Sequence, residues 1–141
     1  MLGRRVKRLV RRRVRSTRRK RTWPAAVVKH YAEHKEAARA LCLTRLEHYN
    51  QHYSLTYNRV AIRNTRSRWG SCSSKKNLNF NYRILFLPSE LQDYLIVHEL
   101  CHLQEMNHAA GFWALVAEQV PDYKKRIAQL RALETELMQM K

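Results

Sequence analysis

Two histidines stand four positions apart at His98 and His102, and a glutamate, Glu99, directly follows the first of them. Residues four apart on a helix lie on one face, one turn above the other, so both imidazoles can bind the same metal ion. Zinc prefers nitrogen ligands in a tetrahedral arrangement. Glu99 is placed to contact a water on that metal and to take its proton as a general base. The HExxH motif therefore predicts a zinc-dependent hydrolase that holds one Zn2+ ion.

A catalytic zinc site needs a third protein ligand, and two residues compete for this role. His108 follows His102 by six residues, the separation found in the metzincin pattern HExxHxxGxxH, although Glu105 stands at the glycine position. Asn107 tolerates a left-handed conformation and is expected to reverse the chain before this histidine. Glu118, the first acidic residue after His108, is the alternative ligand. Ligand preference and spacing favour His108 over Glu118.

Two other histidine pairs have the same spacing and serve as a comparison. They are His30/His34, in the sequence HYAEH, and His48/His52, in HYNQH. Neither pair has glutamate directly after its first histidine, and neither has another histidine at a convenient distance downstream. We expect these four side chains to be polar residues on a helix face rather than zinc ligands.

The HExxH motif falls within a stretch that reads as a helix from about residue 90 to 104. Ser89 and Gln92 are spaced as a capping box at its start. An apolar stripe at intervals of four, three and four residues runs through Leu91, Leu95, His98 and His102. The histidines are therefore expected on the buried side of this helix.

The remaining segments supply the elements that must position this helix. Alanine and leucine dominate residues 25–52, where a helix is expected. Alternating apolar residues predict three short antiparallel strands, at 57–64, 68–73 and 78–84. Apolar stripes predict a short helix from about residue 112 and a last helix that ends near residue 138. The expected fold class is α+β, with an N-terminal helix, a small three-stranded antiparallel sheet, the HExxH helix and C-terminal helices.

Positive charge is concentrated at the N-terminus. Of the 28 Lys and Arg residues that give a net charge of +17, twelve lie within residues 1–22, which contain no acidic residue. Like charges at this density repel one another and do not fold alone. We therefore expect a basic arm over 1–22, flexible or helical, followed by a single domain over 23–141. Such an arm favours contact with a polyanion, either the phosphates of a nucleic acid or an acidic membrane surface.

The cysteine count and the hydropathy bear on location. The three cysteines form no CxxC pair, and an odd, scattered set does not suggest a disulfide framework. No run of 18 apolar residues predicts a membrane span. No apolar segment follows the basic N-terminus as a secretory signal requires. These features favour a cytoplasmic location.

Several short motifs occur in an order that is more specific than HExxH alone. They are Arg66–Ser73 (RSRWGSCS), Leu78–Asn81 (LNFN), Leu87-Pro88, His98–Leu103 (HELCHL), Asn107-His108 and Phe112-Trp113. This order resembles the YgjP-like metallopeptidases and, more distantly, the SprT-like zinc peptidases. The resemblance implies a zincin-like α+β domain with zinc on the three histidines, Glu99 as the base, and the RWGSC segment near the active-site helix. The chain departs from longer members because the basic arm replaces most of their N-terminal β region.

Three functions are compatible with these features. The leading hypothesis is a metallopeptidase that cleaves a peptide or protein substrate. A second keeps the metal but hydrolyses a nucleotide phosphoanhydride, whose charge the basic residues would hold. A third is a protease tethered to nucleic acid by the basic arm, or a binding protein whose zinc is only structural.

Several residues near the motifs are expected to serve structure rather than chemistry. Trp69 and Trp113 are large aromatic residues at predicted buried positions, so we expect both in the core. Gly70 is expected to permit a close approach of the backbone. The arginines of this region are expected at the surface: Arg66, Arg68 and Arg83.

Overall fold

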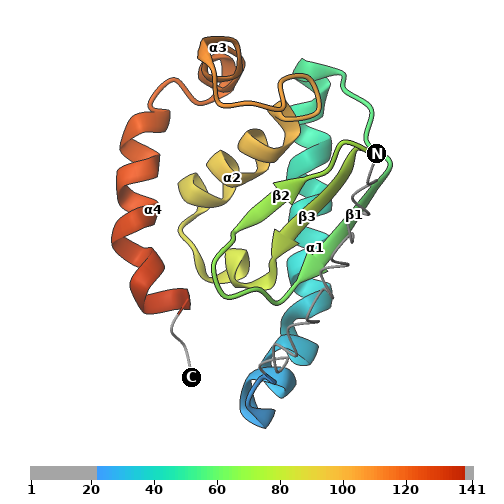
Figure 1. Cartoon of the computed structure of the whole chain (residues 1–141), viewed down its shortest axis with the longest axis vertical. Helices are drawn as coiled ribbons and strands as arrows, with labels where there is room; N and C mark the ends of the chain where they lie inside the picture. Colours follow the sequence, from blue (N-terminus) through green and yellow to red (C-terminus); the bar gives the residue numbers. More distant parts are fainter. Residues whose placement is uncertain (1–21, 139–141) are drawn as a thin grey trace, which may run out of the picture.

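The computed structural model describes residues 22–138 (Figure 1). Its elements in chain order are α1 (Ala25–Tyr53), β1 (Arg59–Arg63), β2 (Gly70–Cys72), β3 (Asn77–Asn81), the 3-10 helix η1 (Tyr82–Phe86), α2 (Ser89–Cys101), α3 (Ala110–Gln119) and α4 (Tyr123–Met138). Helices and a small sheet confirm the expected α+β class. Of the predicted basic arm, only Thr22 lies within the described residues.

The first helix, α1, follows the prediction to within one residue at its end. It begins after Pro24, whose fixed φ suits the residue before a helix. It stops at Ser54, which adopts a left-handed conformation with φ of 53° while its N–H donates to the Asn50 carbonyl at 2.8 Å. The Asn50 side chain also bonds both backbone groups of Leu55, each at 2.8 Å. This cap fixes the direction in which the chain enters β1.

The three strands form one mixed sheet in the order β1-β3-β2. β2 and β3 are antiparallel and joined by a tight turn, in which the Lys76 N–H donates to the Ser73 carbonyl at 2.9 Å. β1 instead pairs with β3 in parallel register, with Arg59 opposite Asn77. The prediction of a purely antiparallel sheet is therefore wrong.

The mixed topology arises because β3 enters between the two strands that precede it. Consecutive strands usually lie next to each other, which is what an alternating pattern suggests. Here residues 64–69 carry the chain past one strand position, about 10 Å across the sheet. The hairpin then returns β3 into that gap. This order leaves β2 at the edge of the sheet, where it contacts α2 (Figure 1).

The core lies between the sheet and the first two helices. Leu78 and Phe80 of β3 are fully buried on one face of the sheet. The helices contribute Ala38, Cys42, Leu46, Ile96, Val97 and Leu100, all fully buried as well. α2 is buried on most of its sides, which holds the HExxH segment rigidly in place.

A short 3-10 helix replaces the expected end of the third strand. The Asn81 side chain accepts a hydrogen bond from the Arg83 N–H at 3.0 Å, and this bond caps η1. Arg83 is fully buried, so the prediction that it lies at the surface is wrong. Its guanidinium donates to the Asn64 side chain at 3.0 Å and to the Thr65 carbonyl at 3.2 Å. Arg83 therefore braces the segment that joins β1 to β2.

The start of α2 differs from the predicted capping box. Pro88 precedes the helix, and no side chain caps its first turn. Gln92 is 7% exposed and donates to the carbonyls of Ile84 (3.0 Å) and Leu85 (3.4 Å) in η1. Because buried carbonyl groups require partners, Gln92 satisfies η1 rather than the N-terminus of its own helix. The Ser89–Gln92 box is thus a wrong prediction.

None of the helices in the described part of the chain combines the length and the apolar character needed to cross a membrane.

Candidate active site

Three histidine nitrogens meet at one point beside α2. The Nε2 atoms of His98 and His102 are 3.2 Å apart, and each lies close to Nε2 of His108, at 3.3 and 3.1 Å respectively. His98 lies in the last turn of α2, His102 directly follows that helix as its C-cap, and His108 comes from the loop before α3. Among residues 22–138, no other three His, Cys, Asp or Glu side chains bring their ligand atoms within 4.8 Å of one another. The set can hold one metal ion.

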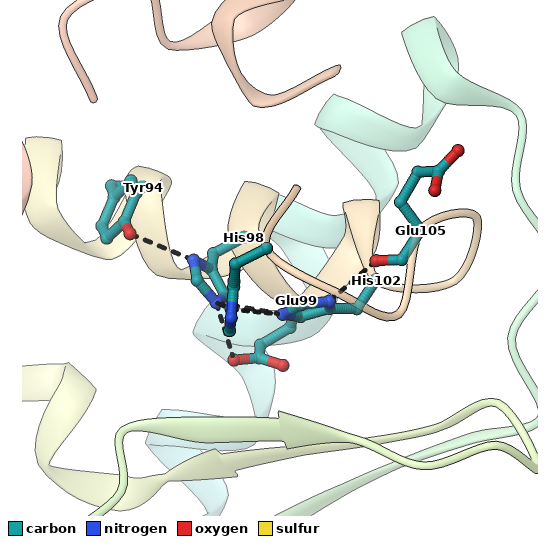
Figure 2. A network of polar contacts seen from close by, with 6 residues as sticks. Tyr94, His98, Glu99, His102 and Glu105 are labelled. Carbon is teal, nitrogen blue, oxygen red and sulfur yellow. Dashed lines mark hydrogen bonds and ion pairs between the residues drawn. The ribbon is translucent and has the colours of Figure 1, made fainter. Parts of the chain in front are cut away.

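Hydrogen bonds at the far side of the His98 and His102 rings engage Nδ1 of both residues. Nδ1 of His102 lies 2.9 Å from the Glu105 carbonyl, which only accepts, so Nδ1 carries the proton and Nε2 keeps its lone pair. Nδ1 of His98 lies 3.0 Å from the Tyr94 hydroxyl. Figure 2 shows these contacts on the side of the rings away from the meeting point. Such partners orient imidazole ligands toward a metal.

Phe112 of α3 packs against all three imidazole rings. Its ring stacks on His102 at 4.3 Å between centroids, and it meets His98 and His108 edge-on at 5.0 and 5.1 Å. Phe112 is fully buried. It therefore fixes the ring orientations from the apolar side. The sequence motifs included Phe112 but did not predict this contact.

His108 is held by the residue that follows Phe112. The Trp113 indole N–H donates to the His108 carbonyl at 3.1 Å, and the two rings stack at 5.9 Å. Trp113 is only partly buried and also stacks on Tyr123 at 4.8 Å. Trp69, by contrast, is a core residue as predicted. Trp113 thus holds His108 in place and also packs against the core.

The loop that carries His108 turns without the expected left-handed residue. Within the described residues, only Ser54 and Lys76 among non-glycine residues have positive φ, so the prediction for Asn107 is wrong. Its side chain instead accepts a hydrogen bond from the Ala109 N–H at 3.3 Å. This Asx-type bond supports the turn locally.

The other candidate ligands lie elsewhere. Glu118 Oε2 is 3.2 Å from His52 Nε2, on the exposed surface between α3 and the end of α1. His30 contacts the Tyr82 hydroxyl at 2.9 Å through Nδ1, and His34 contacts the His30 carbonyl at 2.7 Å. These histidines bond to single protein groups and do not converge with a third ligand. The geometry thus favours His108 over Glu118 as the third ligand.

Glu99 is a buried carboxyl group beside the histidines. It is 5% exposed, and its Oε1 lies 4.0 Å from His98 Nε2. Its Oε2 has no hydrogen-bond partner within the described part of the chain. Burial raises the pKa of Glu99 to about 8. Burial, followed by the neighbouring His102 and His108, lowers the pKa of His98 to about 3.

Those two pKa values describe the site without a metal. At neutral pH both side chains are then uncharged, so the contact between Glu99 and His98 is not an ion pair. A buried carboxyl oxygen without a partner is costly, and three converging imidazole Nε2 atoms can all direct lone pairs at one cation. The donor set therefore matches a metal cation.

Gly70 allows β2 to lie directly against Glu99. A Cβ atom at Gly70 would fall 2.9 Å from the Asn79 carbonyl oxygen and 2.9 Å from Glu99 Cγ. Both distances are shorter than side chains tolerate, so any larger residue must displace the sheet or the carboxyl group. This confirms the expected close approach at Gly70 and places the RWGSC segment next to α2.

The histidines and Glu99 line an open cleft of about 190 Å³ between α2 and the edge of the sheet. Its other wall comes from Gly70, Ser71, Cys72 and Met106. In Figure 2 the Glu99 side chain points from α2 toward the nearest strand. The sequence motifs did not include Tyr94. Its position four residues before His98 places the two side chains on one face of α2, and this spacing is the sequence signal for their contact.

Solved structures with a similar fold are metallopeptidases. The metallopeptidase zymogen of Pyrococcus abyssi, abylysin, has a TM-score of 0.59 and 23% identity, over 66% of this chain and 95% of that one. The metallopeptidase zymogen of Methanocaldococcus jannaschii, jannalysin, has a TM-score of 0.49 and 23% identity, over 65% of this chain and 94% of that one. At this identity, the similarity to abylysin shows a common fold. No curated protein sequence matches the chain significantly.

A family model provides the assignment that the fold alone does not. The model of the YgjP-like metallopeptidase domain matches residues 4–133, which is nearly the whole chain and includes most of the basic N-terminal segment. The match also spans HExxH, the RWGSC segment and His108. This chain therefore belongs to the YgjP-like metallopeptidase family.

Proposed function

We propose that this metallopeptidase uses one zinc ion on His98, His102 and His108, with Glu99 as its general base. The observation that carries the proposal is the triangle of Nε2 atoms, with sides of 3.1 to 3.3 Å. Zinc–nitrogen bonds of about 2.0–2.1 Å in a tetrahedral site separate the nitrogens by about 3.3–3.4 Å. The residues present therefore fit zinc without rearrangement.

When bound, zinc lowers the pKa of a coordinated water to about 7 and polarises the carbonyl of the peptide. The carboxylate of Glu99 accepts the proton of the attacking water and delivers it to the amide nitrogen as the C–N bond breaks. Glu99 suits this role because its Oε2 has no protein partner within the described residues. Tyr94 and the Glu105 carbonyl keep Nδ1 of the two helix histidines engaged and Nε2 directed into the cleft.

The edge of β2 supports binding of a peptide backbone. β2 pairs with β3 on one side only, and its Gly70–Cys72 segment lines the cleft on the other. An extended peptide can add to such an edge through main-chain hydrogen bonds. We propose that the substrate lies along this edge, with its cleaved bond facing the histidines.

The Glu99→Gln variant tests the mechanism. It keeps the shape of the side chain but removes the base, so zinc should stay bound at one equivalent while peptide cleavage is abolished. Cleavage of a generic peptide library at the wild-type rate by this variant would refute Glu99 as the base. Release of phosphate from nucleotides by the wild type, without peptide cleavage, would favour the phosphoanhydride alternative instead.

For residues 1–22 we propose a role in binding a polyanion such as a nucleic acid. The support is charge alone, twelve basic and no acidic residues. Phosphate contacts make affinity fall steeply with salt concentration. Deletion of residues 1–22 should therefore weaken DNA binding and flatten its salt dependence. Equal affinities of the full and the shortened chain at every salt concentration would refute this role.

A further inference from the structure

The proposed catalytic cleft adjoins a second and larger cavity, of about 290 Å³. The residues of this cavity that matter here are Arg63, Thr65, Arg68, Gly70, Ser71 and Asn79. Gly70 and Ser71 also line the cleft, so the two hollows meet at β2. Gly70 lies against Glu99, so one residue of β2 borders both the second cavity and the proposed base.

The second cavity has a strong positive charge with nothing to balance it. Arg63 and Arg68 line it, and no acidic side chain does. Residues 48–89, which include the whole sheet, contain seven Lys or Arg and no Asp or Glu. Neither Arg63 nor Arg68 forms an ion pair with another described residue. Both guanidinium groups are therefore available to an external anion.

The backbone that presents Arg68 is fixed by buried side chains. Asn81 is 1% exposed, and its amide donates to the carbonyls of Thr65 (2.9 Å) and Arg68 (3.0 Å). The Thr65 hydroxyl also donates to the Arg68 carbonyl, at 2.7 Å. The buried Arg83 guanidinium bonds the same segment at Asn64 and Thr65. Arg68 thus projects from a rigid turn rather than from a loose loop.

Arg63 is tied to the edge strand through the sheet. Its Nε donates to the Asn79 side chain at 3.3 Å, and the Asn79 amide donates to the Ser71 hydroxyl at 3.2 Å. Ser71 lies opposite Asn79 in the register of β2 and β3, whereas Arg63 lies opposite Asn81 and reaches Asn79 diagonally. The remaining donors of the Arg63 guanidinium are left for a ligand, at a position set by the sheet.

We infer that this cavity is a substrate subsite for a peptide with a carboxylate side chain near the cleaved bond. The inference rests on the proposed peptidase function and names its substrate class. A peptide strand paired with β2 rises about 3.4 Å per residue and alternates its side chains between two faces. A side chain within about two residues of the cleaved bond therefore reaches Ser71 and the arginines. Two guanidinium groups bind a carboxylate through charge-assisted hydrogen bonds.

A nucleic acid phosphate is the rival anion. Non-specific binding of single strands usually adds aromatic side chains on which bases stack. The cavity offers polar side chains and arginines, and its one aromatic lining residue, Phe80, is fully buried. The cavity also shares Gly70 and Ser71 with a cleft that belongs to a peptidase. A peptide carboxylate therefore accounts for more of the features than a phosphate does.

The test uses the full chain loaded with zinc and a set of fluorogenic peptides with both ends capped. At each position around the cleaved bond, the peptides carry either Glu or its neutral isostere Gln. We expect kcat/KM to be about tenfold higher for Glu at one position, as a charge-assisted hydrogen bond provides. Arg63→Ala and Arg68→Ala should bring this ratio toward one, and Arg68→Glu should favour Lys at the same position.

Arg59→Ala is the matched control. Arg59 is exposed, lies on β1 with Arg63 and does not line the cavity. Its replacement removes the same charge, so the Glu-to-Gln ratio should stay as in the wild type. An equal loss in Arg59→Ala and Arg68→Ala would show general attraction by the basic surface and would overturn the subsite. If a Gln peptide with a free C-terminus is cleaved with the same kcat/KM as the capped Glu peptide, the cavity binds a terminal carboxylate. That result would overturn the side-chain preference.

The outcomes separate the subsite from the catalytic proposal. Equal hydrolysis of the Glu and Gln peptides at every position overturns the subsite and leaves the peptidase. Absence of hydrolysis of any peptide overturns the proposed function and the subsite with it. Binding to zinc-loaded Glu99→Gln gives a readout without turnover, and the Glu peptide should bind about tenfold tighter than the Gln peptide. A short oligonucleotide and unlabelled Glu peptide can each be used to displace labelled Glu peptide. If the oligonucleotide does so at the lower concentration, the cavity is assigned to phosphate and the subsite is overturned.

Discussion

Helices α1 and α2 both carry histidines four residues apart, yet only the pair in α2 meets a third imidazole. His98 and His102 direct their Nε2 atoms to a common point with His108. In α1 the rings of His30 and His34 are also close, at 4.3 Å between centroids, but they pack beside Phe86 and bond to protein groups. The same helical spacing therefore gives different chemistry in the two helices.

The neighbours of each pair account for the difference. The pair in α2 faces a loop that supplies His108 and a buried carboxyl group, Glu99. In α1 the acidic residue between the histidines is Glu33, whose side chain is 53% exposed and pairs with Lys29. Spacing brings two rings onto one face, and burial and a third ligand decide whether that face can bind and use a metal. Matched variants in the two helices test this difference.

The largest expected effect follows the replacement of the two glutamates. Glu99→Gln should lower kcat for peptide cleavage by about 10²–10⁴, the usual contribution of a general base, with zinc content unchanged. Glu33→Gln should leave both quantities at wild-type values because Glu33 lies at the surface of α1. Turnover assays with zinc analysis by mass spectrometry measure both. A loss of zinc together with activity in Glu99→Gln would make Glu99 a ligand.

Replacement of one histidine in each pair should change metal affinity in one helix only. His102→Ala removes one of three ligands and should weaken zinc binding by more than about 100-fold, beyond the effect of losing a hydrogen-bonded partner of a ligand. His34→Ala should bind zinc as the wild type does. Competition with a chelator of known affinity gives both constants. Equal weakening in the two variants would mean that α1 also holds the metal.

The tyrosine hydroxyl groups that contact one histidine of each pair give a finer test. Tyr94→Phe removes the bond to Nδ1 of His98 and should lower zinc affinity by about tenfold, the lower end for groups that orient a ligand. Tyr82→Phe removes the corresponding bond to His30 and should have no effect on zinc. The same chelator titration measures both. An unchanged affinity in Tyr94→Phe would show that Phe112 alone orients His98.

The last comparison concerns the stability of the metal-free protein. Burial raises the pKa of Glu99 to about 8 from an ordinary value of 4.5. As the pH rises, the unfolded chain loses the Glu99 proton at a lower pH than the folded protein does. The free energy of unfolding of the metal-free protein therefore falls as the pH rises from 4.5 through 8. Glu99→Gln lacks this loss, so its Tm advantage over the wild type should grow over that pH range.

Thermal unfolding in a chelator at several pH values between 4 and 9 measures this advantage. His98 has a lowered pKa, about 3, and so favours folding less as the pH falls below 6.5. That trend is common to both proteins and cancels in the difference. Glu33→Gln, at an exposed position, should follow the wild-type profile. A Tm difference that shrinks as the pH rises would contradict the burial of a neutral Glu99.

Local patterns predicted much of this fold and most of the candidate site. The helix propensity of residues 25–52 placed α1 to within one residue at its end, and the spacing of HExxH put two proposed ligands on one helix face. Ligand preference and the six-residue spacing from His102 favoured His108 over Glu118. Each of these depends on interactions between residues close together in the chain, and such interactions are visible in the sequence.

The errors share a different physical origin. The parallel pairing of β1 with β3, the buried Arg83 and the use of Gln92 to satisfy η1 all depend on segments that meet only after folding. Gln92 has the spacing of a capping residue, but the carbonyls of Ile84 and Leu85 lie closer to it in the folded protein. Local propensity does not contain these competitors, so it assigned each residue to its nearest partner in sequence.

The sequence by itself determined the residues of the proposed site: two histidines one helical turn apart, a glutamate beside the first, and a third histidine after the helix. It also determined a glycine where the strand must come close. The tertiary structure decided what surrounds them. It placed β2 at the sheet edge against Glu99, stacked Phe112 on the imidazoles, and brought Arg63 and Arg68 together beside the cleft. Helical spacing is a local property of the backbone, whereas burial and convergence depend on how distant segments pack.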